Sequence, residues 1–362
     1  MRKLWQISDE SIPESSFMAP TFSIIIPLYN CQRYIAQCLE SLKAQTLGDF
    51  EAIIVDDGST DGGMAAARNA AGDDERFLFL SLPENRGQGA ARNRALDVAR
   101  GGILLLLDAD DYLAPQALQR IAQRFDAQRL DELYFGAETF YEDAAAYRCI
   151  TEDFQPRDDF SEVATGAELF RFFEERGQFF PHAALRALRL SMVKEHNIRF
   201  REDIIHEDLL FTMQTLLVSQ RSSLLNETLY HRRIRKGSTM ASPRRTLRNI
   251  EGHLVAVRFM REWMTQRAEQ LDAGFIAALS HRITDYLDLC ARDYLNDVTD
   301  DEKAAHLATL DGRQRMEFEL DVVQRAELLR EFYNSRTWRV GQAVVAAPQF
   351  IRSRIALLMR KR

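Results

Sequence analysis

Three carboxylates fall within four residues at Asp108-Ala109-Asp110-Asp111, directly after the aliphatic run at 103–107. Unpaired negative charges held so close together repel one another, and a hard cation would relieve that repulsion. Mg²⁺ and Mn²⁺ prefer oxygen ligands, and proteins usually hold them through one or two carboxylates together with substrate phosphates. The spacing therefore predicts a divalent-metal site or, as the plainer alternative, a solvated acidic turn that leads into a helix opening at Pro115.

A second acidic turn, Asp56-Asp57-Gly58-Ser59-Thr60-Asp61, follows another apolar run. Gly58 permits a positive φ, and the polar residues after it can cap the next helix, so a capped strand-to-helix loop is part of its role. One of its carboxylates could also accept a hydrogen bond from a pyrimidine N–H or a ribose hydroxyl. The turn is not a phosphate loop, because two acids repel phosphate and the GxxxxGK[ST] pattern is absent from the sequence.

A third polar segment, 85–93, contains Gly87 and Gly89, where the backbone could approach a ligand closely. Arg92 in this segment could pair with a diphosphate or with the aspartate cluster, although a lone helical arginine is commonly just solvated or salt-bridged. The fourth feature is the pair Glu207-Asp208 at the start of an apolar segment. Acids in the first turn of a helix commonly interact only with its dipole, whereas a carboxylate beside a sugar hydroxyl could act as a general base.

The segments between these motifs alternate between two hydrophobic patterns, short apolar runs and stretches with helical spacing. The predicted strands are 22–28, 50–55, 77–82 and 103–107, and the predicted helices are 34–45, 64–71, 89–100 and one that opens at Pro115. This alternation predicts an α/β fold with a mostly parallel sheet and helices on both faces. Ligands of such sheets bind beyond the carboxyl ends of the strands, where the acidic turns fall.

The charge is distributed unevenly over the 362 residues. The net charge is -7, but the segment from Arg336 to the end carries seven basic residues and no acid, so the rest of the chain stands at -14. An acidic body argues against nucleic acid as the main partner. The four cysteines form no CxxC pair, which favours a reducing compartment over a disulfide scaffold or a zinc site.

The chain divides into five predicted parts. They are a leader at 1–20, two halves of an α/β domain at 21–135 and 136–244, a helical region at 245–333 and a basic amphipathic tail at 334–362. No run of apolar residues is long enough for a membrane helix, and the leader lacks the apolar region of a secretory signal.

Taken together, the ordered motifs resemble the family 2 glycosyltransferases with the GT-A fold. The segments that match the family's motifs, in the family's order, are 22–30, 40–46, 55–61, 85–93 and 107–113. The match continues more thinly through 198–200, Glu207-Asp208 and 230–240. It departs from the family at Ala183-Ala184, where many relatives carry a polar pair.

The resemblance implies an inverting, metal-dependent transfer of a sugar from a nucleotide-diphospho-sugar, with a UDP-sugar favoured. The implied acceptor is a hydroxyl of a glycan or a lipid-linked glycan in the synthesis of a bacterial surface polysaccharide. The residues expected to bind the nucleotide-sugar are Pro27, Tyr29, Asn30, Asp56, Asp57, Arg86, Gly87, Arg92, Asp108, Ala109, Asp110, Arg233, Arg235 and Ser238. Asp108, Asp110 and Asp111 are the expected ligands of Mn²⁺ or Mg²⁺, and Glu207 or, preferably, Asp208 is the expected base.

The tail interleaves apolar residues such as Trp338 and Phe350 with cations. This pattern predicts binding to a membrane surface, on the cytoplasmic face of the plasma membrane, and the alternative is a helix docked on the acidic body. Two other functions stay open at this stage. One is a non-catalytic nucleotide-binding scaffold of a glycan-assembly complex. The other is a nucleotidyltransferase, which expects a glycine-rich basic loop where this chain has Tyr29-Asn30-Cys31-Gln32.

Overall fold

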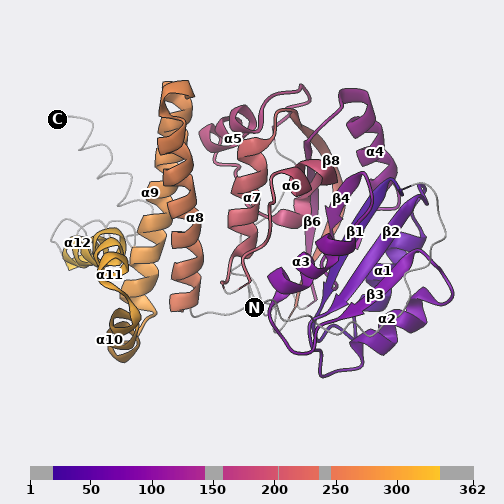
Figure 1. The fold of residues 1–362 in the computed structure, drawn as a ribbon, viewed down its shortest axis with the longest axis horizontal. Coiled ribbons are helices and arrows are strands. Elements are labelled where there is room, and N and C mark those ends of the chain that lie inside the picture. Colours follow the sequence, from indigo (N-terminus) through magenta and orange to yellow (C-terminus); the bar gives the residue numbers. More distant parts are fainter. Residues whose placement is uncertain (1–18, 143–157, 203, 236–245, 335–362) are drawn as a thin grey trace, which may run out of the picture.

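The computed structural model describes residues 19–142, 158–202, 204–235 and 246–334 (Figure 1). Eight strands form one sheet in the order β3-β2-β1-β4-β7-β6-β8-β5. In chain order the strands are β1 (Phe22–Leu28), β2 (Phe50–Asp56), β3 (Phe77–Ser81), β4 (Ile103–Leu106), β5 (Tyr112–Leu113), β6 (Glu132–Tyr141), β7 (Arg186–Arg189) and β8 (Ser222–Ile234).

The first half of the sheet is parallel and confirms the strands predicted from the apolar runs. Strand β1 pairs in parallel with β2 on one side and with β4 on the other, and β2 pairs in parallel with β3. Strands β1, β2 and β4 are buried along almost their whole length, as expected for a parallel sheet covered on both faces. Their carboxyl ends bring the turns after 28, 56 and 106 to one edge of the sheet.

The second half of the sheet is mixed. Strand β7 runs antiparallel to both β4 and β6, while β6 and β8 run parallel to each other. The two-residue strand β5 pairs antiparallel with β8, so that Tyr112 lies opposite His231. This pairing places the acidic turn at 108–111 beside the last residues of β8. Arg233 is two residues after His231 in that strand.

Helices cover the sheet, and most of them follow the predicted alternation. In chain order they are α1 (Ile35–Lys43), α2 (Gly63–Ala71), α3 (Gln88–Val98), α4 (Ala117–Gln128), α5 (Gly166–Glu175), α6 (Leu190–Glu195) and α7 (Glu207–Val218). The chain moves outward from β1 to β3 through α1 and α2 and returns to β4 through α3. Because such crossovers are right-handed, α1 and α2 lie on one face and α3 on the other.

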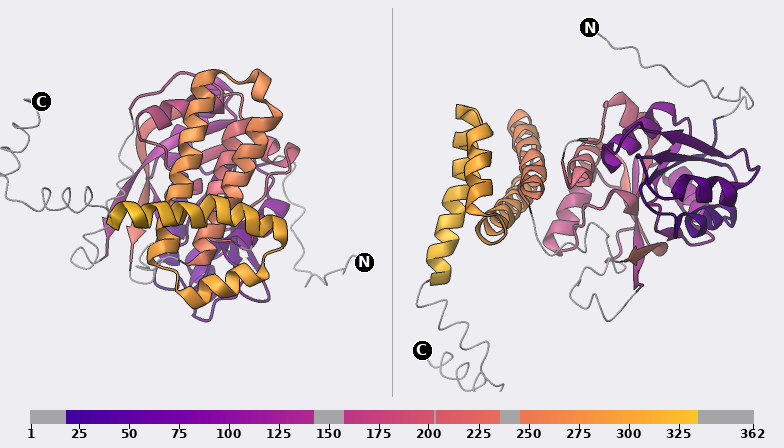
Figure 2. Two further views of the ribbon diagram at one scale, coloured as in Figure 1. Left: turned by 90° about the vertical axis from the view of Figure 1, so that its left-hand side faces the viewer. Right: turned by 90° about the horizontal axis from the view of Figure 1, so that it is seen from below.

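Five further helices form the C-terminal region: α8 (Leu247–Gln266), α9 (Ala273–Asn296), α10 (Asp300–Thr309), α11 (Gly312–Phe318) and α12 (Gln324–Asn334). Helices α8 and α9 stand side by side against α5 and α7, and α10 to α12 lie outside them (Figures 1 and 2). One apolar cluster is centred on the sheet and a second is shared by α5, α7 and the C-terminal helices. The second cluster joins the helical region to the helix that carries Glu207 and Asp208.

Some predictions fall outside the described residues. These are the leader up to residue 18, Ser238 and the tail from 335 onward. The division of the chain at residues 20, 135, 244 and 333 stays a prediction. Among the helices of the described ranges, none has both the length and the apolar character needed to cross a membrane.

Candidate active site

The acidic turn after β4 lies between two arginines that come from distant parts of the chain. The guanidinium group of Arg92 on α3 donates from Nη2 to Asp108 Oδ1 over 2.9 Å. Arg235, just beyond β8, donates from Nε to Asp110 Oδ2 over 2.7 Å. Two of the three carboxylates are therefore neutralised by ion pairs within the protein.

Asp111, the third carboxylate, points into the protein and is held there by β8. The hydroxyl of Tyr230 donates to Asp111 Oδ2 over 2.6 Å, and the backbone N–H of Arg233 donates to Asp111 Oδ1 over 2.7 Å. Tyr230 also accepts a hydrogen bond from the backbone N–H of Asp108. Asp111 is only 4% exposed, and this burial, together with the charges of Asp110 and Asp108, raises its pKa well above the ordinary value.

The turn fits a cation held by two of the expected ligands better than one held by all three. In the parts of the chain that the structure describes, no three His, Cys, Asp or Glu side chains converge as a metal site. Both oxygens of Asp111 already accept hydrogen bonds, whereas the side chains of Asp108 and Asp110 are 26% and 19% exposed. One or two carboxylates are enough for Mg²⁺ or Mn²⁺ when substrate phosphates complete the shell.

Arg92 joins this turn to the start of α7. Its Nη1 donates to Glu207 Oε1 over 2.8 Å while its Nη2 holds Asp108, and the guanidinium group lies 5.2 Å from the centre of the Phe200 ring. Arg92 is 3% exposed and Glu207 is 4% exposed. The sequence left open whether Arg92 pairs with a diphosphate or with the aspartates, and the structure pairs it with the aspartate turn.

Asp208 lies one residue beyond this ion pair and, unlike Glu207, has no ion-pair partner among the residues that the structure describes. Among the described residues, no side chain donates a hydrogen bond to it. Burial and the neighbouring charge of Glu207 raise the pKa of Asp208 to about 7, although Arg92 acts in the opposite direction. A carboxylate with this pKa and no competing donor is well suited to accept a proton near neutral pH.

The acidic turn after β2 is held in place by hydrogen bonds within its own loop and from the loop that follows β3. The buried carboxylate of Asp57 accepts a hydrogen bond from the backbone N–H of Arg86 over 2.8 Å, and burial raises its pKa. Asp56 Oδ1 accepts from the backbone N–H of Ser59 within the turn. The side chain of Arg86 reaches across to Glu202 over 2.6 Å. Asp57 and Arg86, both expected to bind the nucleotide-sugar, thus lie beside each other, and the contact with Glu202 was not predicted.

Helix α3 begins at Gly87, whose φ of +87° favours glycine. A Cβ atom on Gly89 would lie 2.8 Å from the carbonyl oxygen of Arg201, so α3 and the segment before α7 are in close contact. The side-chain amide of Asn93 donates to the carbonyl of Phe200 and to Glu202. These contacts connect the segment 85–93 to the segment just before Glu207-Asp208. The only sign of this contact in the sequence was the presence of small residues, such as Gly89, in α3.

The loop after β1 is hydrogen-bonded to the loop after β2. Asn30 has a left-handed φ of +50°, and its Oδ1 accepts a hydrogen bond from the backbone N–H of Thr60 over 2.9 Å. Tyr29 beside it is 45% exposed, and Pro27 lies in β1 opposite Val55. Tyr29 is therefore the residue of this loop whose ring is open to a ligand, whereas Asn30 is committed to holding the two loops together.

A cluster that the sequence did not reveal surrounds Tyr34. The guanidinium groups of Arg233 and Arg235 each lie 5.0 Å from the centre of the Tyr34 ring. The hydroxyl of Tyr34 and the side chain of Arg33 both donate to Glu142. Arg233 also donates from Nε to the carbonyl oxygen of Asp110, so both predicted β8 arginines lie against the acidic turn.

Ala109 within the turn is buried, and the segment 182–184 lies next to the turn. His182 accepts a hydrogen bond from the backbone N–H of Ala184 at Nδ1, and burial together with the charge of Arg232 lowers its pKa to about 3. Ala183 and Ala184, where the sequence departs from the family, are also buried. His182 is therefore a neutral structural histidine next to the acidic turn.

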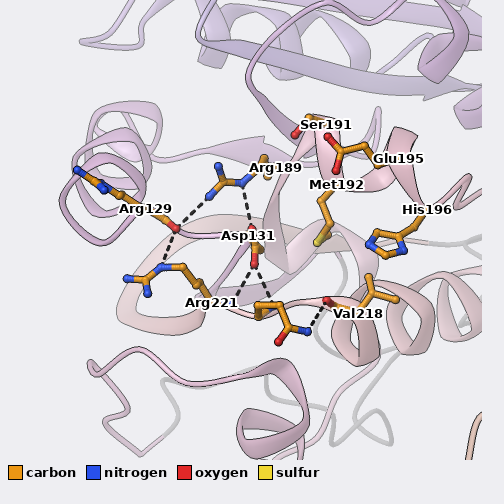
Figure 3. A pocket seen from close by; sticks show the side chains of 10 residues that line it. Arg129, Asp131, Arg189, Ser191, Met192, Glu195, His196, Val218 and Arg221 are labelled. Atoms are coloured by element: carbon orange, nitrogen blue, oxygen red, sulfur yellow. Dashed lines mark hydrogen bonds and ion pairs between the residues drawn. The ribbon is translucent and has the colours of Figure 1, made fainter. Parts of the chain in front are cut away.

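An open pocket of about 670 Å³ lies at the other end of the strands (Figure 3). Its residue Arg189 pairs with Ile103 at the start of β4, whereas the acidic turn follows the end of that strand. Arg189 and Arg221 both donate to the carbonyl oxygen of Arg129 at the end of α4. These arginines bind the carbonyl group at the end of α4. Because the pocket lies at the start of β4 rather than at its end, it is separate from the candidate site.

Part of the chain is similar to a known family of enzymes. Residues 23–193 match the profile of the family described as glycosyl transferase family 2. These residues, a little under half of the chain, form a glycosyl transferase family 2 domain. The family profile ends before α7, so Glu207, Asp208 and the β8 arginines lie beyond it.

Two sequence relatives and one solved structure illustrate the family 2 relationship. The putative glycosyltransferase EpsH of Bacillus subtilis is 30% identical over 222 residues, which are 60% of this chain and 62% of EpsH. A chondroitin synthase of Escherichia coli is 41% identical over 106 residues, which are 29% of this chain and 15% of the synthase. The chain thus spans about three fifths of the length of EpsH.

The structure of residues 1–349 of TarS from S. aureus in complex with UDP-GlcNAc superimposes with a TM-score of 0.59. The alignment covers 84% of this chain and 81% of that chain at 22% sequence identity. This likeness confirms the predicted fold class, an α/β GT-A fold with a C-terminal helical extension.

Proposed function

We propose that the chain transfers a sugar from a nucleotide-diphospho-sugar to a hydroxyl group of a glycan with inversion at the anomeric carbon. The observation that carries the proposal is the double ion pair of Arg92, which brings Asp108 and Glu207 to one guanidinium group. The acidic turn and the start of α7 thereby flank the same place. A donor diphosphate beside the turn would lie within reach of Asp208.

The transfer is a single in-line displacement. Asp208 accepts the proton of the acceptor hydroxyl, and the acceptor oxygen forms a bond to the anomeric carbon. The bond between that carbon and the diphosphate oxygen breaks at the same time, and the nucleoside diphosphate leaves with the electron pair. Inverting hydrolases activate water with a carboxylate base in the same way. A base of this kind contributes about 10² to 10⁴ in rate.

The leaving diphosphate needs positive charge. Asp108 and Asp110 would hold Mn²⁺ or Mg²⁺, with Asp111 orienting the turn from behind. When bound, the cation would neutralise the charge that develops on the diphosphate. Arg233 and Arg235 lie at the same turn and would add fixed positive charge there.

The donor is proposed to be a UDP-sugar. Support comes from the exposed ring of Tyr29, on which a base can stack, and from the paired turns that hold Asp57 and Arg86 beside it. The structural neighbour TarS is described in complex with UDP-GlcNAc. The ionised carboxylate of Asp57, which already accepts from the backbone N–H groups of Arg86 and Gly87, would accept a further hydrogen bond from the uracil N–H.

The acceptor is proposed to be a glycan or lipid-linked glycan of a bacterial surface polysaccharide. The relationship to a chondroitin synthase supports a growing polysaccharide as the acceptor class. We further propose that the protein works at the cytoplasmic face of the plasma membrane, with the basic tail as the part that binds the membrane. A glycan assembled on a lipid carrier would be presented there.

The first test is thermal stabilisation by UDP-, GDP-, CDP- and dTDP-sugars with and without Mn²⁺, followed by a transfer assay with the nucleotide that binds. Any ligand bound only by the folded state raises the melting temperature. We expect a Mn²⁺-dependent shift with UDP-sugars, and transfer that Asp208→Asn abolishes without abolishing the shift. Binding with no turnover of any donor would instead identify a nucleotide-binding scaffold. Release of pyrophosphate from a nucleoside triphosphate would identify a nucleotidyltransferase.

A further inference from the structure

His206, the residue directly before the acidic pair of α7, has a left-handed backbone. Its φ is +67° and its ψ is +36°, a region that a histidine occupies less readily than glycine or asparagine. Such a conformation persists where the surrounding structure imposes it. The conformation of His206 sets the direction in which the chain enters α7, and hence the direction of Asp208.

The surroundings that impose this conformation belong to α8, in the C-terminal helical region. A Cβ atom on Gly252 would lie 1.8 Å from the carbonyl oxygen of Ile205, so the backbone of α8 touches the turn before α7. The ring of His253 lies 4.4 Å from the ring of His206, centre to centre. The side-chain nitrogen of Asn249 lies 3.2 Å from His206 Nε2. Three residues of one α8 turn thus contact a two-residue segment.

The orientation of the Asn249 amide is fixed by a separate interaction. Its Oδ1 accepts hydrogen bonds from the backbone N–H of Thr246 over 2.8 Å and from the Thr246 hydroxyl over 2.9 Å, which caps the start of α8. With its oxygen committed, Asn249 can present only its NH₂ group to His206. An amide NH₂ is a donor, so the Nε2 atom of His206 accepts in this contact.

We infer that α8 positions the proposed catalytic base, with Asn249 and His253 as positioning residues that act through His206. The inference rests on the proposed function, because it assigns a role to residues that support Asp208. The apolar contacts between α7 and α8 involve other side chains, including Leu209, Leu210, Ile250 and Leu254. A change at Asn249 therefore alters the turn before α7 while the two helices stay packed.

The test is Asn249→Asp, with Thr246→Ala as its matched control. Asn249→Asp keeps the oxygen that caps α8 but turns an acceptor toward His206 Nε2. Thr246→Ala weakens the same cap but keeps the NH₂ group in place, because the backbone N–H of Thr246 still holds Asn249 Oδ1. At pH 8.5 we expect Asn249→Asp to lower kcat by about 10-fold or more, since small misplacements of a catalytic group cost up to about 10²-fold. The KM for the donor should stay within about twofold, since the donor contacts lie on other elements.

A second measurement does not depend on turnover. Hydrogen exchange of the backbone amides at 207–209 should be faster in Asn249→Asp than in the unchanged protein, and unchanged in Thr246→Ala. If the protein shows no transfer at all, the proposed function fails, while this exchange pattern would still establish the positioning contact. Equal losses of kcat in both variants, in proportion to their melting temperatures, would overturn the inference. So would a normal kcat with normal exchange in Asn249→Asp.

Discussion

Arg92 and Glu207 are 115 positions apart in the sequence, yet their side chains form a buried ion pair of 2.8 Å. The same guanidinium group also holds Asp108, so one cation is shared by the acidic turn and the start of α7. Glu207 is a poor candidate for the base, because its carboxylate is already paired with the guanidinium group of Arg92. We therefore prefer Asp208, the next residue, as the proposed base.

Replacing Arg92 with methionine should destabilise the protein strongly. The change leaves Glu207 buried without its partner, and breaking a buried pair in this way costs about 3–5 kcal/mol of the free energy of unfolding. Arg86→Met is the matched control, because the Arg86–Glu202 pair is 49% and 37% exposed and should contribute about 1 kcal/mol or less. Urea unfolding of both variants measures the difference, and equal losses would contradict a special role for Arg92.

The rate of transfer should depend on the ionisation of Asp208. A base works only when deprotonated, so kcat/KM should rise about tenfold per pH unit below pH 7 and level off above it, given a pKa of about 7. The measurement is a pH profile of kcat/KM at saturating Mn²⁺. A flat profile between pH 5 and 8 would exclude Asp208 as the base.

The raised pKa of Asp208 also has a consequence for stability. Folding raises this pKa above the value of an ordinary aspartate, so the folded state is favoured while Asp208 is protonated and loses that advantage as the pH rises through about 7. Asp208→Asn removes the buried charge. We expect the variant to melt at a higher temperature than the unchanged protein at pH 8, and the difference to shrink at pH 5. A lower melting temperature at pH 8 would contradict this expectation.

Removing Arg235 should free Asp110 for a cation. Arg235 pairs with the Asp110 carboxylate, whereas Arg233 donates to the Asp110 carbonyl, so the two arginines make a matched pair of changes. Without donor, Arg235→Ala should bind Mn²⁺ about 5-fold more tightly, the equivalent of about 1 kcal/mol, and Arg233→Ala should bind it as before. Both should bind the UDP-sugar more weakly. Titration of Mn²⁺ by electron paramagnetic resonance distinguishes these outcomes from a common effect on folding.

The hydroxyl of Tyr230 should stabilise the acidic turn. Tyr230→Phe leaves Asp111 buried with one hydrogen bond fewer, which should lower the free energy of unfolding by about 1–3 kcal/mol. Tyr34→Phe loses a hydroxyl that bonds to Glu142 at the surface and should cost less. Denaturation of the two variants under the same conditions makes the comparison, and an equal effect would mean that the Asp111 contact adds nothing.

The parallel half of the fold was predictable because its strands are buried on both faces. The run 103–107 is wholly apolar and Asp108 stands directly after it, and 22–28 is apolar apart from Ser23 and leads into Tyr29 and Asn30. The mixed half was not predictable in this way. Strand β8 pairs with β6 across a separation of about 90 residues, so no short-range pattern in the sequence indicates their pairing.

The candidate site likewise contains residues that the sequence could identify and residues that it could not. Asp108, Asp110, Asp57 and Asp208 carry their chemistry in their side chains and stand at strand or helix ends, so their positions were visible in the sequence. Other residues gain a role only through a distant neighbour. Tyr230 looks like one more apolar strand residue, and Asn249 looks like an ordinary helix cap until His206 is placed beside it.

The apolar side of α7 has one further consequence. Leu209, Met213 and Leu216 are buried in a cluster whose other members come largely from α5, α8 and α9. The family-wide segment, 23–193, ends before any of α7, α8 or α9 begins. Grafting that segment alone into another protein would leave out the proposed base, Asp208. A graft that ended after α7 would expose the apolar side of that helix to water, because α8 and α9, which help to cover it, would be missing.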